Sequence, residues 1–371
     1  MTDAVISPAE THLLAEQRGR LGVITLNRAA ALNALSLGMI RDLANRLRAW
    51  EQDDTIDAVL VHGAGRPGKA PAFCAGGDIR FFHVAALSGD PRLEDFFTEE
   101  YALNHLIHGY PKPYIAWMDG ICMGGGMGIS QGASHRVVTE HSKLAMPETH
   151  IGLFPDVGGG WFLSRCAGRL GEYLALTGHT LHAADAIAAG LADIELPSSA
   201  LAQVIGALAA LPWLTMQSIA DALRAHAVAA PAPAALSAHR EAIDRHFAAA
   251  DLAGIVESLR HDGSAWAEAT RAALAQRSPL MMAVTVEQVR RARTMSLADD
   301  LRMERDLVRH CFQLRPGAAS ETVEGIRALA VDKDHAPRWN PPQVAEVTQA
   351  MIDAFFASPW PAHAHPLAGL R

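Results

Sequence analysis

Cysteine is scarce in this sequence, and no two cysteines have the Cys-x-x-Cys spacing of a zinc site or a redox motif. The four that occur, Cys74, Cys122, Cys166 and Cys311, lie far apart along the chain. Isolated thiols of this kind are typical of reduced, small apolar side chains in an intracellular protein. The scarcity argues against a disulfide-rich secreted domain and against a cysteine-based metal centre.

Long apolar runs and long basic runs are also missing. No apolar run approaches the ~20 uncharged residues that a transmembrane helix needs. The formal net charge is -8, and the lack of a basic run argues against a nucleic-acid surface. The N-terminus, Met1-Thr2-Asp3-Ala4, lacks the basic region and apolar core of a signal peptide. We therefore expect a soluble cytoplasmic protein that binds neither membrane nor nucleic acid.

Material for a hydrophobic core is abundant. Half of the 371 residues are hydrophobic and 19% are charged, which is a globular composition. Residues 13–26 predict a β-hairpin, and Ser36 is suited to cap a helix whose apolar residues recur at helical spacing. A strand over residues 57–62 follows, so strand, helix and strand form a right-handed crossover unit typical of an α/β core.

The second half of the sequence is different in character. From about residue 165 the chain is rich in alanine and leucine, with an apolar period close to that of an α-helix. We expect an α/β core over residues 1–195 and a helical region over residues 196–371. The last helix is predicted over residues 344–356. A Pro/Ala-rich connector at residues 228–236 is the best candidate for an internal linker.

Two carboxylates stand in an apolar run that covers residues 145–160. Glu148 follows Pro147, and Asp156 follows Pro155, which disfavours regular helix at both positions. Apolar surroundings raise the pKa of a carboxyl group and suit it to proton transfer. Glu148 and Asp156 are therefore our first candidates for catalysis. The alternative is that they cap helices or end turns.

Two glycine-rich turns each follow a strand-like stretch: Ala75-Gly76-Gly77 and Gly124-Gly125-Gly126. Each turn could open a helix and so present free backbone N–H groups. Two such donors that converge on one oxygen atom form an oxyanion hole. Glycine also simply permits tight turns, so neither turn is specific alone. Together with the two carboxylates, they supply donors, acid and base in one chain.

Three other patterns are weaker. Residues 128–132 match the G-x-S-x-G elbow of serine hydrolases, but we expect Ser130 to lie inside a helix and not at the end of a strand. Two histidine pairs, His105 with His108 and His363 with His365, have no acidic or cysteine companions at ligand spacing, so a metal site is not expected. Arg66 and Lys69 are placed either to meet phosphate or to form a solvated loop, and Glu99-Glu100 would ordinarily be a solvated face.

The glycine turns and the two prolyl-flanked carboxylates together identify a family. Residues 73–78, 124–126, 146–148 and 155–160 resemble the motifs of the crotonase (enoyl-CoA hydratase/isomerase) superfamily, and the similarity covers nearly the whole chain. The resemblance implies an α/β fold, the crotonase (ClpP/crotonase-like) spiral of ββα units, followed by a helical C-terminal region.

The resemblance also implies roles for residues of the site. The backbone N–H groups of Gly77 and Gly125 would hold the oxygen of a thioester. Glu148 matches the catalytic glutamate of the family and Asp156 its partner, while Glu100 would meet the acyl group. Substrate binding is expected at Gly76 and Asp78, and coenzyme A (CoA) binding at Asn27, Arg28, Arg66 and Lys69.

One departure separates subfamilies. Hydratases of this superfamily carry a second glutamate where this chain has Gly128, so half of their acid–base apparatus is missing here. The resemblance thus implies hydrolysis of a short 3-hydroxyacyl-CoA thioester, in valine catabolism. A hydratase or isomerase, or a non-catalytic acyl-CoA-binding protein, are the alternatives. No metal or other cofactor is implied, since CoA arrives with the small-molecule substrate. Crotonases commonly form trimers, so a homo-oligomer stays open.

Overall fold

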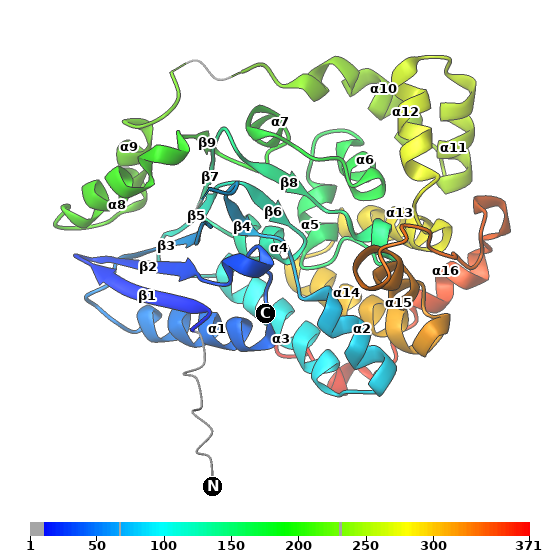
Figure 1. Cartoon of the computed structure of the whole chain (residues 1–371), viewed down its shortest axis with the longest axis horizontal. Coiled ribbons are helices and arrows are strands. Elements are labelled where there is room, and N and C mark those ends of the chain that lie inside the picture. The colour runs from blue at the N-terminus through cyan, green and yellow to red at the C-terminus, as the bar shows by residue number, and fades with distance from the viewer. Residues whose placement is uncertain (1–10, 67, 230–231) are drawn as a thin grey trace, which may run out of the picture.

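The structure is a computed structural model that describes residues 11–66, 68–229 and 232–371. The residues outside these ranges are 1–10, which include the Met1–Ala4 stretch, Pro67 between Arg66 and Lys69, and residues 230–231 of the connector. Within the described chain, two sheets lie in the first half and helices make up most of the second (Figure 1). No helix of this part is both long enough and apolar enough to cross a lipid bilayer.

The larger sheet has six strands in the order β1-β2-β3-β5-β7-β9. Its strands are β1 (Leu13–Arg18), β2 (Leu21–Leu26), β3 (Ala58–Gly63), β5 (Tyr114–Met118), β7 (His135–Val138) and β9 (Ile194–Glu195). Only the β1–β2 hairpin is antiparallel. The smaller parallel sheet has the order β4-β6-β8, from β4 (Ala72–Cys74), β6 (Ile121–Met123) and β8 (Lys143–Ala145). The strands that precede the two glycine turns, β4 and β6, are therefore neighbours.

Helices of the first half alternate with these strands. They are α1 (Leu37–Glu51), α2 (Ile79–Ser88), α3 (Arg92–His108), α4 (Gly125–Gln131), α5 (Gly159–Ser164), α6 (Leu170–Thr177) and α7 (Ala183–Ala188). Later helices are α8 (Leu201–Ala209), α9 (Met216–Arg224), α10 (Arg240–Phe247), α11 (Leu252–His261), α12 (Ala265–Leu274), α13 (Pro279–Ala292), α14 (Leu297–Gln313), α15 (Glu321–Ile326) and α16 (Gln349–Phe356). Single turns of 3-10 helix include η2 (Glu148–Ile151) and η7 (Val344–Glu346), and η6 (Arg327–Val331) is a π-helix. The remaining 3-10 turns are η1 (Ala29–Ala31), η3 (Ser198–Ala200), η4 (Ala235–His239), η5 (Gly317–Ala319) and η8 (Ala362–Ala364).

The central strands of the six-stranded sheet are buried on both faces. Along β2, Leu21 and Val23 pack on one face, whereas Ile24 and Leu26 join the core on the other. Helices α8 and α9 cover the first face, and α1 and α3 belong to the core of the second (Figure 1). Parallel strands covered on both sides appear in the sequence as continuous apolar runs, because neither face meets water.

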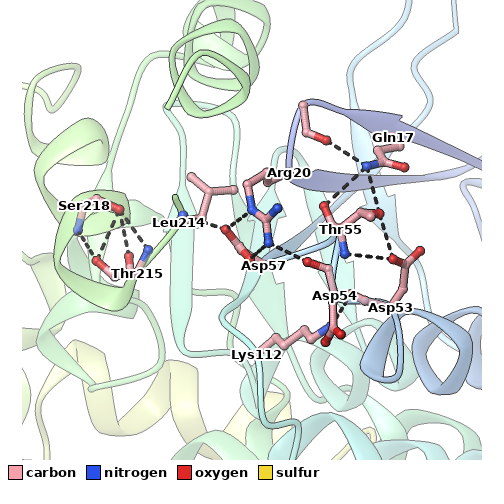
Figure 2. Close-up of polar contacts among 11 residues, drawn as sticks. Gln17, Arg20, Asp53, Asp54, Thr55, Asp57, Lys112, Leu214, Thr215 and Ser218 are labelled. Atoms are coloured by element: carbon pink, nitrogen blue, oxygen red, sulfur yellow. Dashed lines mark hydrogen bonds and ion pairs between the residues drawn. The ribbon is translucent and has the colours of Figure 1, made fainter. Parts of the chain in front are cut away.

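A polar cluster fixes the α8–α9 pair to the sheet (Figure 2). Arg20, between β1 and β2, places two nitrogen atoms 2.6 Å from carboxylate oxygens of Asp57, just before β3. The same carboxylate accepts a hydrogen bond of 3.0 Å from the backbone N–H of Leu214, which lies between α8 and α9. The Arg20 guanidinium also lies over the Trp213 ring, 4.5 Å from its centre. These donors, above all Arg20, lower the pKa of Asp57, so the carboxylate stays charged in the folded protein.

Most local predictions are confirmed. The hairpin forms as expected, Ser36 caps α1 by accepting from the backbone N–H of Met39, and β3 follows. The prediction of one continuous helix over residues 344–356 is wrong. There η7 ends at Glu346, and Thr348 caps a new helix, α16, by accepting from the backbone N–H of Met351. The chain therefore changes direction between the two, because a capping threonine has extended backbone geometry.

The proposed division at residue 195 remains a prediction. All strands of the described residues lie before it, and the chain beyond it is helical. Yet side chains from both sides share one core: the rings of Phe97 in α3 and Phe312 in α14 lie 5.7 Å apart. The helical region thus packs directly against the elements that carry the predicted site.

Candidate active site

A cavity of about 230 Å³ opens where the two glycine turns meet η2 and the turn that follows it. Its walls also include side chains of α2, of α3 and of η6 from the C-terminal region. The lining residues are Ala75, Gly76, Gly77, Ile79, Phe82, Phe97, Glu100, Gly124, Gly125, Pro147, Glu148, His150, Ile151, Leu153, Asp156, Val157 and Leu329. The structure therefore brings six of the residues singled out from the sequence into one cavity: Gly76, Gly77, Glu100, Gly125, Glu148 and Asp156.

The two glycine turns lie side by side in the wall of this cavity. A Cβ atom placed on Gly125 would lie 3.4 Å from the backbone nitrogen of Gly77. Gly125 is the first residue of α4, so its N–H has no partner within that helix. Among the described residues, no acceptor is found for the N–H of Gly77 or Gly125. Two free donors on adjacent turns can bind one oxygen atom of a ligand.

The glycines also make room for carboxylates. A Cβ on Gly125 would approach Oε1 of Glu100 to 2.5 Å, and one on Gly124 would approach Oε1 of Glu148 to 2.7 Å. These are closer than carbon and oxygen atoms can pack. The backbone of this turn can therefore face both carboxylates at short range only because side chains are missing at both positions.

Three carboxylates are buried here, from three different elements. Glu100 lies on α3, Glu148 begins η2, and Asp156 lies in the turn between η2 and α5. Their exposed fractions are 2%, 6% and 5%. Oε1 of Glu100 and Oε2 of Glu148 are buried without a hydrogen-bond partner among the described residues. Unpaired buried oxygens are costly, so their presence together favours a role toward a ligand.

Burial raises the pKa of all three carboxyl groups. For Glu100 and Glu148 the pKa lies well above its usual value, and repulsion by Asp156 adds to the effect of burial. Burial raises the pKa of Asp156 to about 6, although a hydrogen bond from Tyr101 opposes the rise. A group with a pKa near neutrality exchanges protons readily, so Asp156 is suited to acid–base chemistry.

Tyr101 is a site residue that sequence reasoning missed, because an aromatic residue on a helix is ordinarily part of the core. Its hydroxyl donates a buried hydrogen bond of 2.8 Å to Oδ2 of Asp156. The helix turns the two acidic neighbours apart: Glu100 faces the cavity, whereas Glu99 pairs with Arg41 on the outside, 2.6 Å away. The solvated-face interpretation thus holds for Glu99, and Glu100 is buried.

No side chain fits at position 128, where hydratases carry their second glutamate. A Cβ on Gly128 would lie 2.7 Å from Cβ of Val157 and 2.9 Å from Nδ2 of Asn104. Both neighbours are packed inside the protein, and Val157 belongs to the same turn as Asp156. Position 128 therefore supplies no carboxylate next to this turn, and Asp156 supplies the one that the turn carries.

The residues expected to meet CoA phosphates lie apart from the carboxylates. Arg28 pairs with Asp78 at 2.7 Å, and Asp78 also caps α2. Neither residue lines the cavity, although substrate binding was expected at Asp78. Asn27 donates from its side chain to the carbonyl of Thr11. Arg66 and Lys69 lie in a partly exposed loop. The predicted catalytic and oxyanion-hole residues thus line one cavity, and the residues predicted to bind CoA do not line it.

The serine elbow is absent, as expected. Ser130 is buried inside α4, where its hydroxyl donates to the carbonyl of Met127 at 3.2 Å. In the part of the chain that the structure describes, no cluster of three histidine, cysteine, aspartate or glutamate side chains is arranged to hold a metal ion.

The fold and the site together match a known family. The family model described as enoyl-CoA hydratase/isomerase matches residues 21–356. The chain therefore belongs to the enoyl-CoA hydratase/isomerase family, and the crotonase resemblance drawn from its motifs is confirmed.

Curated relatives within this family are more specific. A Xenopus tropicalis protein named 3-hydroxyisobutyryl-CoA hydrolase, mitochondrial, is 42% identical over 96% of this chain and 91% of its own length. Relatives with the same name from Danio rerio and Homo sapiens are 41% and 39% identical, over 95% and 94% of this chain and 91% and 89% of their own lengths.

Solved structures confirm the fold. A carnitinyl-CoA dehydratase from Mycobacterium thermoresistibile superposes with a TM-score of 0.84 at 40% identity, covering 93% of this chain and 96% of the other. An enoyl-CoA hydratase from Rhodobacter sphaeroides gives a TM-score of 0.84 at 35% identity, with coverages of 94% and 98%. The crotonase fold with its helical C-terminal region is thus shared over almost the whole chain.

The expected cytoplasmic location is wrong. The curated relatives from Xenopus tropicalis, Danio rerio and Homo sapiens are all named as mitochondrial proteins, which contradicts it. The expectation was based on the lack of a signal-peptide pattern and of long apolar runs, together with thiols without disulfide partners, and the four cysteines are indeed free and buried. Free buried thiols argue against secretion, but they do not distinguish one intracellular compartment from another.

Proposed function

We propose that this protein hydrolyses 3-hydroxyisobutyryl-CoA to 3-hydroxyisobutyrate and free CoA. The observation that carries the proposal is that Glu148 and Asp156 line one cavity with two free backbone N–H groups, whereas Gly128, outside the cavity wall, has no room for a side chain. The names of relatives at 39% to 42% identity support the same reaction. No cofactor takes part, because hydrolysis of a thioester needs only water and proton transfer. A role in valine catabolism belongs to the proposal.

Hydrolysis begins at the thioester carbonyl. The carbonyl oxygen accepts hydrogen bonds from the N–H groups of Gly77 and Gly125, which stabilise the negative charge of the tetrahedral intermediate. Each donor of this kind is worth roughly 3–4 kcal/mol. The C–S bond then breaks, and the leaving thiolate has an intrinsic pKa near ~8.5, so it departs without strong acid assistance.

Glu148 acts on the carbonyl carbon in one of two ways. As a nucleophile it forms a mixed anhydride, which water then opens; as a general base it takes a proton from the attacking water. Asp156 orients Glu148 or accepts the proton of the water, and Tyr101 fixes the Asp156 carboxylate through its hydroxyl. Both routes end with a new C–O bond, a free carboxylate product and CoA released as a thiol or a thiolate.

Glu100 accounts for the preference for a 3-hydroxyl group. Its Oε1 atom is buried in the cavity and has no partner among the described residues, so it is free to accept a hydrogen bond from the substrate. A site that leaves such a group unpaired without the right ligand discriminates strongly against analogues that lack the hydroxyl.

Replacing Glu100 by alanine should therefore change the choice of substrate. Wild-type protein should release free thiol from 3-hydroxyisobutyryl-CoA much faster than from isobutyryl-CoA. Without Glu100 the buried 3-hydroxyl is left without a partner, which costs about 1–3 kcal/mol, so the variant should lose about 10- to 100-fold in kcat/KM on the hydroxylated substrate and far less on the other. A thiol-reactive dye measures both rates.

The exposed neighbour supplies the control. Glu99→Ala removes a carboxylate from the adjacent position of the same helix but leaves the cavity intact, so it should keep the wild-type ratio of the two rates. Equal losses on both substrates in the Glu100 variant would mean that Glu100 does not recognise the hydroxyl. A wild-type protein that favours isobutyryl-CoA would contradict the proposed substrate.

A further inference from the structure

Helix α14 carries two buried carboxylates that accept hydrogen bonds from the turn that follows Asp156. Oε2 of Glu304 accepts a hydrogen bond of 2.7 Å from the backbone N–H of Gly158, and its Oε1 accepts one of 2.9 Å from that of Gly160. Asp300, one helical turn earlier, accepts 2.9 Å from the N–H of Trp161. Both carboxylates are fully buried. The C-terminal helical region thus reaches directly into the segment that carries a candidate catalytic group.

The turn itself is strained. Val157 has a φ of +57° and Gly158 a φ of +86°. A β-branched residue is a rare exception in this left-handed region, so the conformation persists only where the surroundings enforce it. Asp156 immediately precedes these two residues. Whatever holds the turn therefore also determines where the Asp156 carboxylate points.

A second side chain completes the contacts. The Nε2 group of Gln288, on α13, donates 2.7 Å to the carbonyl of Pro155 and 3.0 Å to Oε1 of Glu304. The backbone is consequently held before Asp156 at residue 155 and after it at residues 158 and 160. Helix α14 is also tied to α3, since Arg305 donates to the hydroxyl of Thr98 at 2.9 Å.

The charges of this cluster are poorly explained by stability alone. Among the described residues, no lysine, arginine or histidine forms an ion pair with Glu304. Burial, and then repulsion by Asp300, raises the pKa of Glu304, and Asp156 contributes as well. A buried carboxylate without a cation is costly, and its retention beside a candidate catalytic site favours a functional role.

We propose that Glu304 is a positioning residue for the hydrolysis. Its two backbone hydrogen bonds, supported by Gln288, hold the strained turn so that Asp156 faces Glu148 and the hydroxyl of Tyr101. The inference rests on the proposed function for its effect on turnover. The contacts by which Glu304 and Gln288 hold the backbone of residues 155–160, here called the clamp, are testable without substrate.

The kinetic test compares Glu304→Gln with the wild-type protein. Glutamine keeps the size of the side chain but has only one acceptor oxygen for the two N–H groups. Misplacement of a reacting group by about 1 Å can cost about 100-fold, so kcat on 3-hydroxyisobutyryl-CoA should fall about 10- to 100-fold while KM changes little. In an Asp156→Ala background the same substitution should cause almost no further loss, because Glu304 acts through Asp156.

Glu172→Gln provides the matched control. Glu172 is also a fully buried carboxylate, on α6, and it accepts hydrogen bonds from Arg169 and Arg293 away from the cavity. The control should melt at a lower temperature yet keep a kcat close to that of the wild-type protein. An unchanged kcat in Glu304→Gln, or an equal further loss in the Asp156→Ala background, would overturn the inference.

Amide hydrogen exchange separates this inference from the proposed function. Peptides that cover residues 155–162 should exchange at least about 10-fold faster in Glu304→Gln than in the wild-type protein or in Glu172→Gln, since the two N–H groups lose a protecting acceptor. Unchanged exchange would refute the clamp whatever the enzyme hydrolyses. A wild-type protein that releases no thiol would instead refute the proposed function.

A second variant covers the case in which Glu304→Gln does not fold. Gln288→Leu removes the donor to the carbonyl of Pro155 and to Glu304 but leaves both N–H bonds of Glu304 in place. It should lower kcat by about 3- to 10-fold, again with little change in KM. A wild-type kcat in this variant would contradict the clamp.

Discussion

Alanine at Glu148, at Asp156 or at both positions should reduce turnover of 3-hydroxyisobutyryl-CoA to nearly the same residual rate. Positioned acid–base groups contribute about 10²- to 10⁴-fold, so each variant should lose at least about 100-fold in kcat. The two carboxylates act in one step, and removal of either disables it, so their losses do not add. Binding of CoA should be largely kept. Steady-state thiol release and calorimetric CoA titration measure the two quantities.

The pH profile of the wild-type protein belongs to the same prediction. Burial raises the pKa of Asp156 to about 6, and the pKa of Glu148 is also raised. Asp156 acts as an ionised carboxylate, so turnover should fall as the pH falls through the pKa of Asp156, about 6. Among the alanine variants, independent action of the carboxylates would appear as a loss of activation free energy in the double variant equal to the sum of the losses in the two single variants.

Oxygen labelling distinguishes the two roles of Glu148. After single turnover in ¹⁸O-labelled water, label found in the Glu148 peptide by mass spectrometry would support an anhydride, because water attacking the enzyme-side carbonyl leaves its oxygen there. Unlabelled peptide over many turnovers would favour Glu148 as a general base, or attack of water at the substrate-side carbonyl.

Valine at Gly125 should abolish turnover while the protein stays folded. A branched side chain would occupy the space between Gly77 and Oε1 of Glu100, where the thioester oxygen must sit. Valine keeps the backbone N–H, but its side chain would prevent the thioester oxygen from reaching it; loss of one such oxyanion contact costs about 10²- to 10³-fold. The fold should survive because the closest obstacle is the end of a flexible side chain. Thiol release, circular dichroism and thermal melting together measure these effects.

Gly206→Val is the matched control for this variant. Gly206 lies in α8, and a Cβ placed there meets no atom within 4 Å. Its activity should equal that of the wild-type protein. Near-normal rates in Gly125→Val would show that the N–H of Gly125 does not belong to the oxyanion hole.

Local elements could be predicted because their signals are local. The hairpin, the Ser36 cap and the buried strands each depend on a few neighbouring residues and on apolar period. The break before α16 was missed because Thr348 can either continue a helix or cap one, and the choice depends on packing. Element boundaries of this kind are decided by tertiary contacts.

Much of the site could be found from the sequence because its glycines and prolines are unusual. Glu148, Asp156 and the two glycine turns are marked in this way. Tyr101 carries no such mark, since an aromatic residue on a helix is ordinarily part of the core. Glu304 is marked even less: it lies 148 residues after Asp156 in an amphipathic helix rich in charged side chains. Only the folded structure shows which carboxylate of that helix turns inward.

The most direct test of the account is a parallel incubation of the wild-type protein with 3-hydroxyisobutyryl-CoA and crotonyl-CoA. Free thiol and the absorbance of the conjugated double bond are followed in both reactions. We expect stoichiometric thiol from the first substrate, and neither thiol nor loss of the double bond from the second, because the position of Gly128 leaves no room for the second carboxylate of a hydratase. Hydration of crotonyl-CoA without thiol release from 3-hydroxyisobutyryl-CoA would contradict the account.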